Sequence, residues 1–311
     1  MEGGAGRAMI TITKADDPIQ IDRIVLLIYS EPGVGKTSMG FTSKDPLLLD
    51  FDEGAYGSEY RKDTVQVRTW GDVIGLTADD LTPYSTVCVD TVGRLLDALT
   101  AHLIAQNPKI EQGSGVLTMR GWGELKGAYT AWLKKLLSYG KDVVLLAHEK
   151  EEKEGDSRIF RPDIQGGSFG EVFKRCDNIG YLYQGSKGRV LDFNPTERWI
   201  GKNRGALPPI AVPHYSVTPD FLAQTITTIK GHLNRMSHQD DVAKAVVESW
   251  RARFAAVTTG EALTAWVAEV AKTDGVVGAQ VKTLMAERAK ALGLKWEGKK
   301  GAGRYIQVQA A

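Results

Sequence analysis

The 311-residue sequence contains only two cysteines, Cys88 and Cys176, and each lies in an apolar segment. This scarcity excludes a disulfide framework and predicts two buried free thiols in a reducing compartment. Long hydrophobic runs are also missing, because no apolar segment approaches the roughly 20 residues that a membrane-spanning helix needs. No apolar signal segment opens the chain. We therefore expect a cytoplasmic protein that has no membrane partner.

The sequence also lacks an excess of positive or of negative charge. Lys and Arg number 39 and Asp and Glu 38, which gives a formal net charge of +1. A global basic field is thereby excluded, and any contact with nucleic acid must come from local patches. Apolar residues make up 42% and charged residues 25%, which is typical of a soluble globular protein, and the length leaves room for more than one domain.

Composition divides the chain into three expected parts. Residues 1–20 are mostly small and polar and should form a flexible lead-in, in which Met9 is a candidate natural start and residues 1–8 are a candidate foreign segment. Residues 21–236 contain the segments with a clear strand pattern, and a weak alternation at 10–24 would add an edge strand or a lead-in. Residues 237–311 show amphipathic helices and a basic tail at 299–304. We expect this last part to be a small all-α accessory domain with a flexible end.

Apolar segments predict buried strands at 24–29, 46–52, 86–90 and 142–148, a strand pair at 178–183 and 189–193, and helices at 92–106, 122–139 and 219–235. Strands that alternate with helices are typical of an α/β fold with a mostly parallel sheet. Ligands of such sheets bind at the carboxyl ends of the strands. The polar residues that close these strands are therefore the candidates for a functional site.

The strand expected at 24–29 leads directly into SEPGVGKT at 30–37, which has the order of a P-loop. Gly33 and Gly35 let the backbone wrap a phosphate without a Cβ in the way. The loop N–H groups and a helix N-terminus attract the β- and γ-phosphates, Lys36 adds a full positive charge, and the Thr37 hydroxyl can ligate Mg²⁺. Ser30 replaces the first glycine of the pattern, which a negative φ allows. The predicted nucleotide-binding residues are Glu31, Pro32, Gly33, Val34, Gly35, Lys36, Thr37 and Ser38.

Acidic residues close two of the expected strands. Asp90 holds the Walker B position, where a carboxylate supports the Mg²⁺ shell. Asp52 and Glu53 end the strand at 46–52, and a carboxylate beside the γ-phosphate can orient and deprotonate the attacking water. We favour Asp52, because strand alternation places it on the same side as Asp50 but nearer the tip, and we keep Glu53 as the alternative. The competing interpretation is that these acids are solvated or cap turns.

Three further polar residues are candidates for catalytic roles. His148 ends the strand at 142–148, where a polar group can sense the γ-phosphate and pass its state to the next loop. Lys202 and Arg204 follow the last strand pair, and two such cations can reach a neighbouring subunit's phosphates as arginine-finger-type groups. The alternatives are a structural histidine and a solvated basic turn.

In the order SEPGVGKT, LLLDFDEG, VCVDT, VVLLAH and GKNRG, residues 24–235 resemble the RecA-like ATPases, and most closely the core-only, phage-encoded Sak-type single-strand annealing proteins related to RadA. The resemblance implies a RecA-like core that uses ATP and Mg²⁺ and assembles into a homo-oligomeric ring or filament. Asp52 would then activate water, and His148 would sense phosphate, although the family more often has Gln or Asn there. Lys202 and Arg204 would act across the subunit interface, where the active site is completed.

The resemblance also implies that two loops, 107–121 and 149–168, face single-stranded DNA. The candidate DNA-binding residues are Lys109, Arg120, Trp122, Lys153, Arg158, Phe160 and Arg161. Cations with interleaved aromatic rings suit backbone tracking and base stacking. Four glutamates between 149 and 154 oppose phosphate binding by the second loop, and Trp122 also fits the buried face of a helix with Leu125 and Tyr129.

The predicted function is DNA-stimulated ATP hydrolysis by a protein that assembles on single-stranded DNA and promotes annealing or recombination. Its expected partners are that DNA, further copies of the chain and a single-strand-binding protein, in the cytoplasm of a bacterial host if the chain is phage-encoded. One alternative is another P-loop ATPase of phage replication, such as a helicase loader or small helicase, which processive unwinding would reveal. A second is a DNA-binding protein that binds ATP without hydrolysing it, for which a water-activating Asp52 is needless.

Overall fold

The computed structural model describes residues 19–308 except 59, 155–156, 166–167 and 300–301. The lead-in expected over residues 1–20 therefore lies almost entirely outside the described residues. The chain separates into two compact units, one of residues 21–233 and one that begins at Asn234. We call them the core unit and the C-terminal unit. No helix of the described chain is long and apolar enough to cross a membrane.

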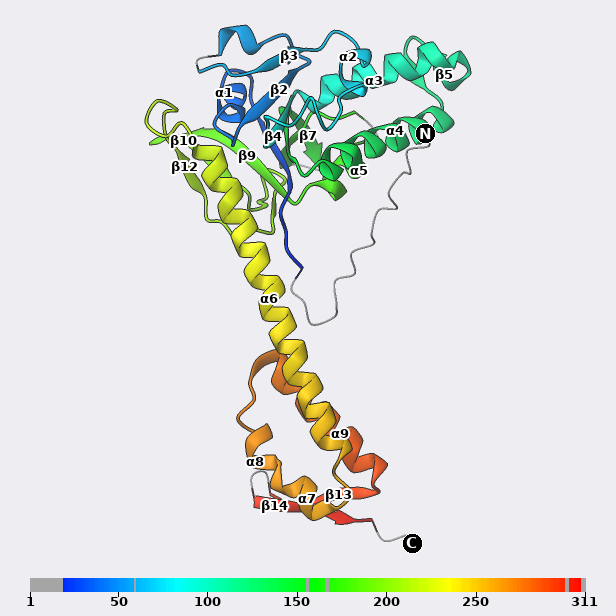
Figure 1. Ribbon diagram of the computed structural model, residues 1–311, viewed down its shortest axis with the longest axis vertical. Coiled ribbons are helices and arrows are strands. Elements are labelled where there is room, and N and C mark those ends of the chain that lie inside the picture. Colours follow the sequence, from blue (N-terminus) through cyan, green and yellow to red (C-terminus); the bar gives the residue numbers. More distant parts are fainter. Residues whose placement is uncertain (1–18, 59, 155–156, 166–167, 300–301, 309–311) are drawn as a thin grey trace, which may run out of the picture. The chain divides into compact units, whose positions relative to one another are not determined.

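A mostly parallel sheet organises the core unit (Figure 1). Its strands follow the order β9-β1-β7-β4-β2-β3, so that β7 lies between the strand before the P-loop and the strand that ends at Asp90. The predicted α/β class and RecA-like P-loop core are confirmed. The bounds are β1 Val25–Ser30, β2 Pro46–Asp50, β3 Thr64–Gln66, β4 Thr86–Asp90, β7 Asp142–Glu154 and β9 Asn178–Gly185.

Burial on both faces explains why the central strands read as continuous apolar runs. Leu27 and Tyr29 of β1 pack into one hydrophobic cluster, and Leu26 and Ile28 into another on the opposite face. Because successive side chains of a strand alternate, a strand covered on both sides needs apolar residues at every position. The register pairs Ser30 of β1 with His148 of β7, which brings the P-loop and the end of β7 to one edge of the sheet.

Helices cover this sheet, and antiparallel strands extend it beyond β9. The helices of the core are α1 Lys36–Gly40, α2 Gly71–Ile74, α3 Val92–Gln106, α4 Met119–Ser138 and α5 Ser168–Arg175. The added strands are β10 Gly188–Asp192, β11 Lys202–Asn203 and β12 Ile210–Val212. Strands β10 and β11 both pair with β9, and β12 pairs with β10.

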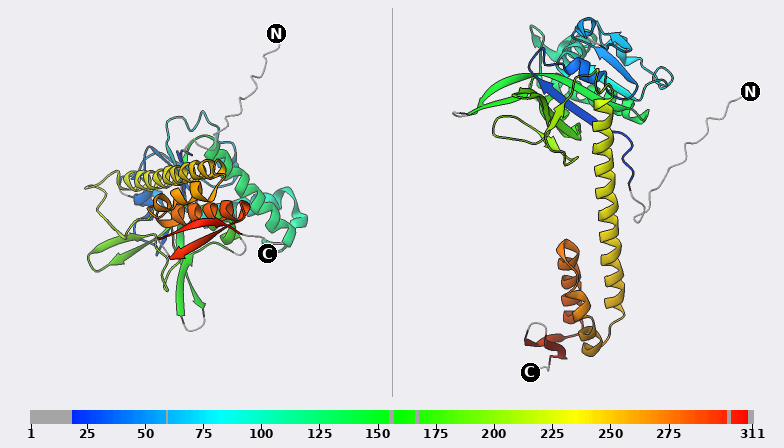
Figure 2. Two further views of the ribbon diagram at one scale, coloured as in Figure 1. Left: turned by 90° about the horizontal axis from the view of Figure 1, so that it is seen from below. Right: turned by 90° about the vertical axis from the view of Figure 1, so that its left-hand side faces the viewer.

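Both segments that were expected to be DNA-facing loops are largely regular structure. Residues 108–110 form a 3₁₀ turn, β5 Glu111–Gly113 pairs with β6 Val116–Leu117, and α4 already begins at Met119. Strand β7 continues beyond His148 to Glu154 and pairs with β8 Ser157–Pro162. This β7–β8 hairpin extends away from the rest of the core in the right-hand view of Figure 2. The loop prediction was wrong because charged strand residues gave no apolar signal.

The C-terminal unit corrects two further predictions. The helix expected to end near Arg235 continues as α6 from Phe221 to Ala255. The part expected to be all-α ends in a hairpin of β13 Leu294–Lys299 and β14 Ala302–Gln307, where a flexible tail was predicted. The other helices are α7 Gly260–Ala265, α8 Val267–Val270 and α9 Gly275–Ala291. The unit has its own core, in which Trp250, Phe254, Val281 and Met285 are buried.

Candidate nucleotide-binding site

The P-loop has the geometry that its sequence predicts. Strand β1 ends at Ser30, the loop turns through Gly33 and Gly35 with φ of 81° and 99°, and α1 starts at Lys36. A left-handed backbone disfavours any residue with a Cβ. A Cβ at Gly35 would also lie 2.6 Å from Nη1 of Arg189, so the end of that side chain would have to move. Both glycines are therefore required by the local conformation.

Lys36 is held at the base of this loop. Its residue is 5% exposed, and its Nζ donates to the Ser30 carbonyl at 3.2 Å, Ser30 Oγ at 3.0 Å and the Glu31 carbonyl at 3.0 Å. The serine that departs from the glycine pattern thus supplies an acceptor for the lysine. Burial lowers the pKa of Lys36, while the charge of Asp90 acts in the opposite direction. A triphosphate in the loop would offer this ammonium group the anionic partner that it lacks.

Thr37 and Asp90 meet where Mg²⁺ is expected. The Thr37 hydroxyl donates to Asp90 Oδ2 at 2.6 Å, across 53 residues of sequence. Asp90 is 4% exposed, and burial raises its pKa, opposed by the hydrogen bond from Thr37. A hydroxyl and a carboxylate are the hard oxygen donors that Mg²⁺ prefers. Among the described residues, no cluster of three or more His, Cys, Asp or Glu is placed to hold a metal ion.

Asp52 and His148 form a second pair on the same edge. His148 Nε2 lies 2.8 Å from Asp52 Oδ2, and Arg94 Nε lies 3.4 Å from Asp52 Oδ1. The other ring nitrogen of His148, Nδ1, is buried and has no hydrogen-bond partner within the described chain. Residues Lys36, Thr37, Asp52, Asp90 and His148 all line one cleft of about 290 Å³. The fold therefore brings together the residues predicted to bind phosphate, hold magnesium, activate water and sense phosphate.

The two acids flanking Asp52 lie differently. Asp50 is fully buried, and its carboxylate accepts hydrogen bonds from the backbone N–H groups of Gly54 and Ala55, so it stabilises the turn after β2. Glu53 is exposed, has φ of 55° and does not line the cleft. Of the two candidates for water activation, the geometry favours Asp52.

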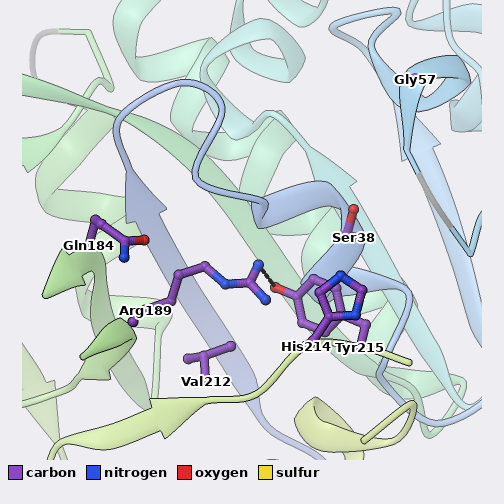
Figure 3. Close-up of a pocket in the computed structure, with 8 residues that line it drawn as sticks. Ser38, Gly57, Gln184, Arg189, Val212, His214 and Tyr215 are labelled. Atoms are coloured by element: carbon purple, nitrogen blue, oxygen red, sulfur yellow. Dashed lines mark hydrogen bonds between the residues drawn. The ribbon is translucent and has the colours of Figure 1, made fainter. Parts of the chain in front are cut away.

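A second pocket adjoins the cleft and was not anticipated from the sequence. It encloses about 470 Å³ and shares Ser38 and Gly57 with the cleft. Arg189 and Tyr215 dominate its wall, and Figure 3 shows their side chains against each other. Its remaining lining residues are Gln184, Gly188, Val212 and His214.

Arg189 and Tyr215 tie this pocket to the P-loop. Arg189 Nη1 donates to the Tyr215 hydroxyl at 3.0 Å and to the Val34 carbonyl at 3.4 Å, and its guanidinium carbon lies 4.4 Å from the centre of the Tyr215 ring. The Tyr215 hydroxyl donates in turn to the Gly35 carbonyl at 3.0 Å. Burial raises the pKa of Tyr215 to about 12, so this donor keeps its proton at neutral pH. About 155 residues separate Arg189 from Val34, and no sequence motif signals the contact.

Glu149 is another acid near the P-loop, and in the sequence it was counted only among the four glutamates that oppose DNA binding. Its Oε2 accepts a hydrogen bond from the Tyr181 hydroxyl at 2.7 Å, and burial raises its pKa. Tyr181 belongs to an aromatic cluster with Phe160, at 5.8 Å between ring centres, and Trp199, at 5.3 Å. The only available signal was its place directly after His148. Glu149 lies at the base of the β7–β8 hairpin and fastens it to β9.

Lys202 and Arg204 lie away from the cleft of their own chain. Lys202 is on β11, which pairs with the first residues of β9, and its Nζ donates to the Cys176 carbonyl. Arg204 Nη1 donates to Asp177 Oδ1 at 2.8 Å. The other Asp177 oxygen accepts from the backbone N–H of Val25, at the start of β1. Both cations therefore sit at the amino ends of the strands, opposite the P-loop.

The candidate DNA-binding residues fall on two surfaces of the core. Lys109 and Arg120 are exposed, and Arg120 pairs with Glu124 at 2.9 Å on α4, whereas the partly buried Trp122 packs against the main core. Lys153, Arg158, Phe160 and Arg161 lie on the β7–β8 hairpin. There Arg158 pairs with Glu151 at 3.0 Å and Arg161 with Glu152 at 3.4 Å.

The chain is similar to several known proteins. A family model described as an AAA domain (AAA_24) matches residues 22–205, which include every residue of the P-loop cleft. The SPbeta prophage-derived uncharacterized protein YorG of Bacillus subtilis strain 168 is 26% identical over 159 residues, which are 45% of this chain and 47% of YorG. The chain thus spans about half the length of this curated relative. The KaiC-like protein PH0186 of Pyrococcus horikoshii OT3 matches with a TM-score of 0.33 and 10% identity over 54% of this chain and 76% of that one.

Proposed function

The chain belongs to the AAA domain family (AAA_24), a family of P-loop ATPases, and we propose that it hydrolyses Mg²⁺-bound ATP, assembles on single-stranded DNA and promotes annealing or recombination. The observation that carries this proposal is the convergence of the Thr37–Asp90 and Asp52–His148 pairs on the cleft that contains Lys36. A protein that only bound nucleotide would need the first pair but not the second. The prophage origin of the relative YorG supports the expectation that the chain is phage-encoded.

Each residue of the cleft has its own role in the proposed hydrolysis. Lys36 and the loop N–H groups offset the charge of the triphosphate. Bound Mg²⁺, held by Thr37 and Asp90, would supply further positive charge to the β- and γ-phosphates. Asp52 orients a water molecule toward the γ-phosphorus and accepts one of its protons as the new P–O bond forms and the bond to the ADP oxygen breaks. His148 holds the Asp52 carboxylate in position through its Nε2.

The pocket of Arg189 and Tyr215 is the proposed site of the nucleoside. It adjoins the phosphate cleft, and its polar and aromatic side chains suit a heteroaromatic base. We expect the double variant Gln184→Ala/His214→Ala to bind ATP about 2- to 10-fold more weakly, the loss of one or two hydrogen bonds. Inorganic tripolyphosphate, which has no base, should compete for the P-loop equally well in variant and wild type. If the variant loses affinity for ATP and for tripolyphosphate equally, this pocket does not bind the nucleoside.

Assembly should complete the active site across subunits. The Arg204 side chain is 54% exposed, and a cation delivered to a neighbour's phosphates can raise the rate by roughly 10³–10⁵. Lys202→Ala/Arg204→Ala should therefore bind ATP but lose most turnover, while Lys36→Ala loses nucleotide. A mixture of the two variants should regain ATP turnover. Activity returns where the intact P-loop of one subunit meets the intact Lys202 and Arg204 of its neighbour. If the double variant is as active as the wild type, Lys202 and Arg204 have only a structural role, through their contacts with Cys176 and Asp177.

The proposal as a whole is tested by ATP turnover with and without single-stranded DNA, followed by an annealing assay on complementary strands. We expect turnover to rise with DNA and annealing to need nucleotide. Processive unwinding of a forked duplex would favour a helicase or helicase loader. Nucleotide binding without turnover under any condition would show that ATP only orders an oligomer.

A further inference from the structure

Charge is distributed unequally between the two units. Residues 21–233 carry 25 Lys and Arg against 27 Asp and Glu, whereas residues 234–311 carry 12 against 8. The excess is concentrated at the end, where residues 272–311 hold eight cations and three acids. The near-neutral net charge of the whole chain conceals this separation. The family match ends at residue 205, so it assigns nothing to the C-terminal unit.

Four of these cations are exposed on helix α9 and on the hairpin that follows it. We call the exposed side chains of Lys282 and Lys290 of α9, Lys295 of β13 and Arg304 of β14 the α9–hairpin surface. None of the four forms an ion pair with another described residue. The nearby acids are Glu287 on α9 and Glu297, which lies opposite Arg304 in the hairpin.

The packing of α9 leaves Lys282 and Lys290 exposed. Val281, Met285 and Ala289 are buried in the unit's core, and Thr283 and Glu287 line a groove together with residues of α6. Lys282 and Lys290 are eight residues apart, about 12 Å along the axis. Between them the exposed face carries only small side chains, Thr283 and Ala286, apart from Glu287. Small residues flanked by lysines let a helix approach a charged surface closely.

The β13–β14 hairpin also carries exposed cations. Trp296 and Tyr305 face each other across the strands, 5.2 Å between ring centres, and Tyr305 packs on the unit's core. Because strand side chains alternate, Lys295 and Arg304 point to the other face. Helix α9 and strand β13 are neighbours joined through Leu292 and Gly293 (Figure 2). The exposed cations of α9 and of the hairpin therefore lie on elements that are in contact.

We propose that the α9–hairpin surface binds the phosphate backbone of double-stranded DNA. Exposed cations without an ion pair among the described residues can neutralise phosphates, and an α-helix fits the major groove, which is about 12 Å wide. A single strand fits less well, because stacking on bases needs exposed aromatic rings. The large exposed apolar residues described in this unit are Met236, Val242, Val246, Val276 and Val308, none of them aromatic. This inference does not depend on ATP hydrolysis or on single-strand binding by the core.

Fluorescence anisotropy of the full-length protein with a labelled 30-base-pair duplex tests this proposal. We expect Lys282→Ala/Lys290→Ala to weaken duplex binding and to reduce the slope of log K against log salt by about 1.8, that is about 0.9 for each phosphate contact. The matched control is Lys44→Ala/Lys134→Ala, which removes two exposed lysines of the core and should behave as wild type. A second test variant, Lys295→Ala/Arg304→Ala, should repeat the effect of the first.

Three results would overturn the proposal. They are no duplex binding by the wild type at 50 mM salt, an unchanged slope in both test variants, and equal losses in the test and control variants. If the variants lose single-strand binding as much as duplex binding, the surface contacts phosphates of both kinds of DNA and is not specific for the duplex. If single-strand binding and ATP turnover persist in a variant that loses only the duplex, the surface acts independently of the core.

Discussion

Replacement of Lys36 by alanine is expected to reduce ATP hydrolysis to background and to weaken ATP binding by about 10- to 100-fold. Lys36 is the full positive charge of the P-loop, and a hydrogen bond to a charged group contributes about 1.5–3 kcal/mol. Turnover is measured by phosphate release, and binding by titration of a fluorescent ATP analogue. Near-normal turnover would end the ATPase interpretation.

The control for this variant must separate lost chemistry from lost folding. Lys36 donates to two groups of Ser30 and to the Glu31 carbonyl, so its removal also leaves buried acceptors unpaired. Lys36→Arg keeps a positive charge and should preserve the melting temperature better than Lys36→Ala. Lys44→Ala, which removes an exposed lysine elsewhere in the core, should change neither activity nor stability.

Asp52→Asn is expected to keep ATP binding and to lose turnover by about 10²–10⁴-fold, the usual contribution of a positioned general base. Asparagine is nearly isosteric and can still accept a hydrogen bond from His148, so the cleft should remain intact. The measurement is kcat beside the affinity for ATP. A variant that turns over at the wild-type rate would remove Asp52 from the mechanism and make Glu149, a further acid near Lys36, the next candidate.

The neighbouring acids provide matched comparisons for Asp52. Glu53→Gln changes an exposed side chain and should leave kcat nearly unchanged. Asp50→Asn should instead lower stability by about 1–3 kcal/mol, because it disturbs a buried acceptor of two backbone N–H groups. His148→Gln keeps a group able to donate to Asp52 and should retain more turnover than His148→Ala. The same kcat for these two His148 variants would show that the histidine does not act through Asp52.

The order of local signals in the chain was enough to predict the ATPase core. The P-loop, the acids that end β2 and β4, and the histidine in β7 each follow a buried apolar strand, and parallel strands bring their carboxyl ends to one edge. That rule alone placed Lys36, Asp90, Asp52 and His148 together. It holds because burial on both faces forces a continuous apolar run, which is visible in a single sequence.

The sequence by itself thus determined the parallel sheet, the P-loop and the acids and histidine around it, since each depends on local backbone geometry or on strand burial. Only the tertiary structure decided that Arg189 and Tyr215 reach Val34 and Gly35, because this contact joins strands added to the far side of the sheet. The structure also shows paired strands and the start of a helix where two loops were expected, and a hairpin where a flexible basic tail was expected. Charged residues that alternate on an exposed strand carry no hydrophobic period, so the backbone pairing that stabilises them becomes visible only when the partner strand is in place.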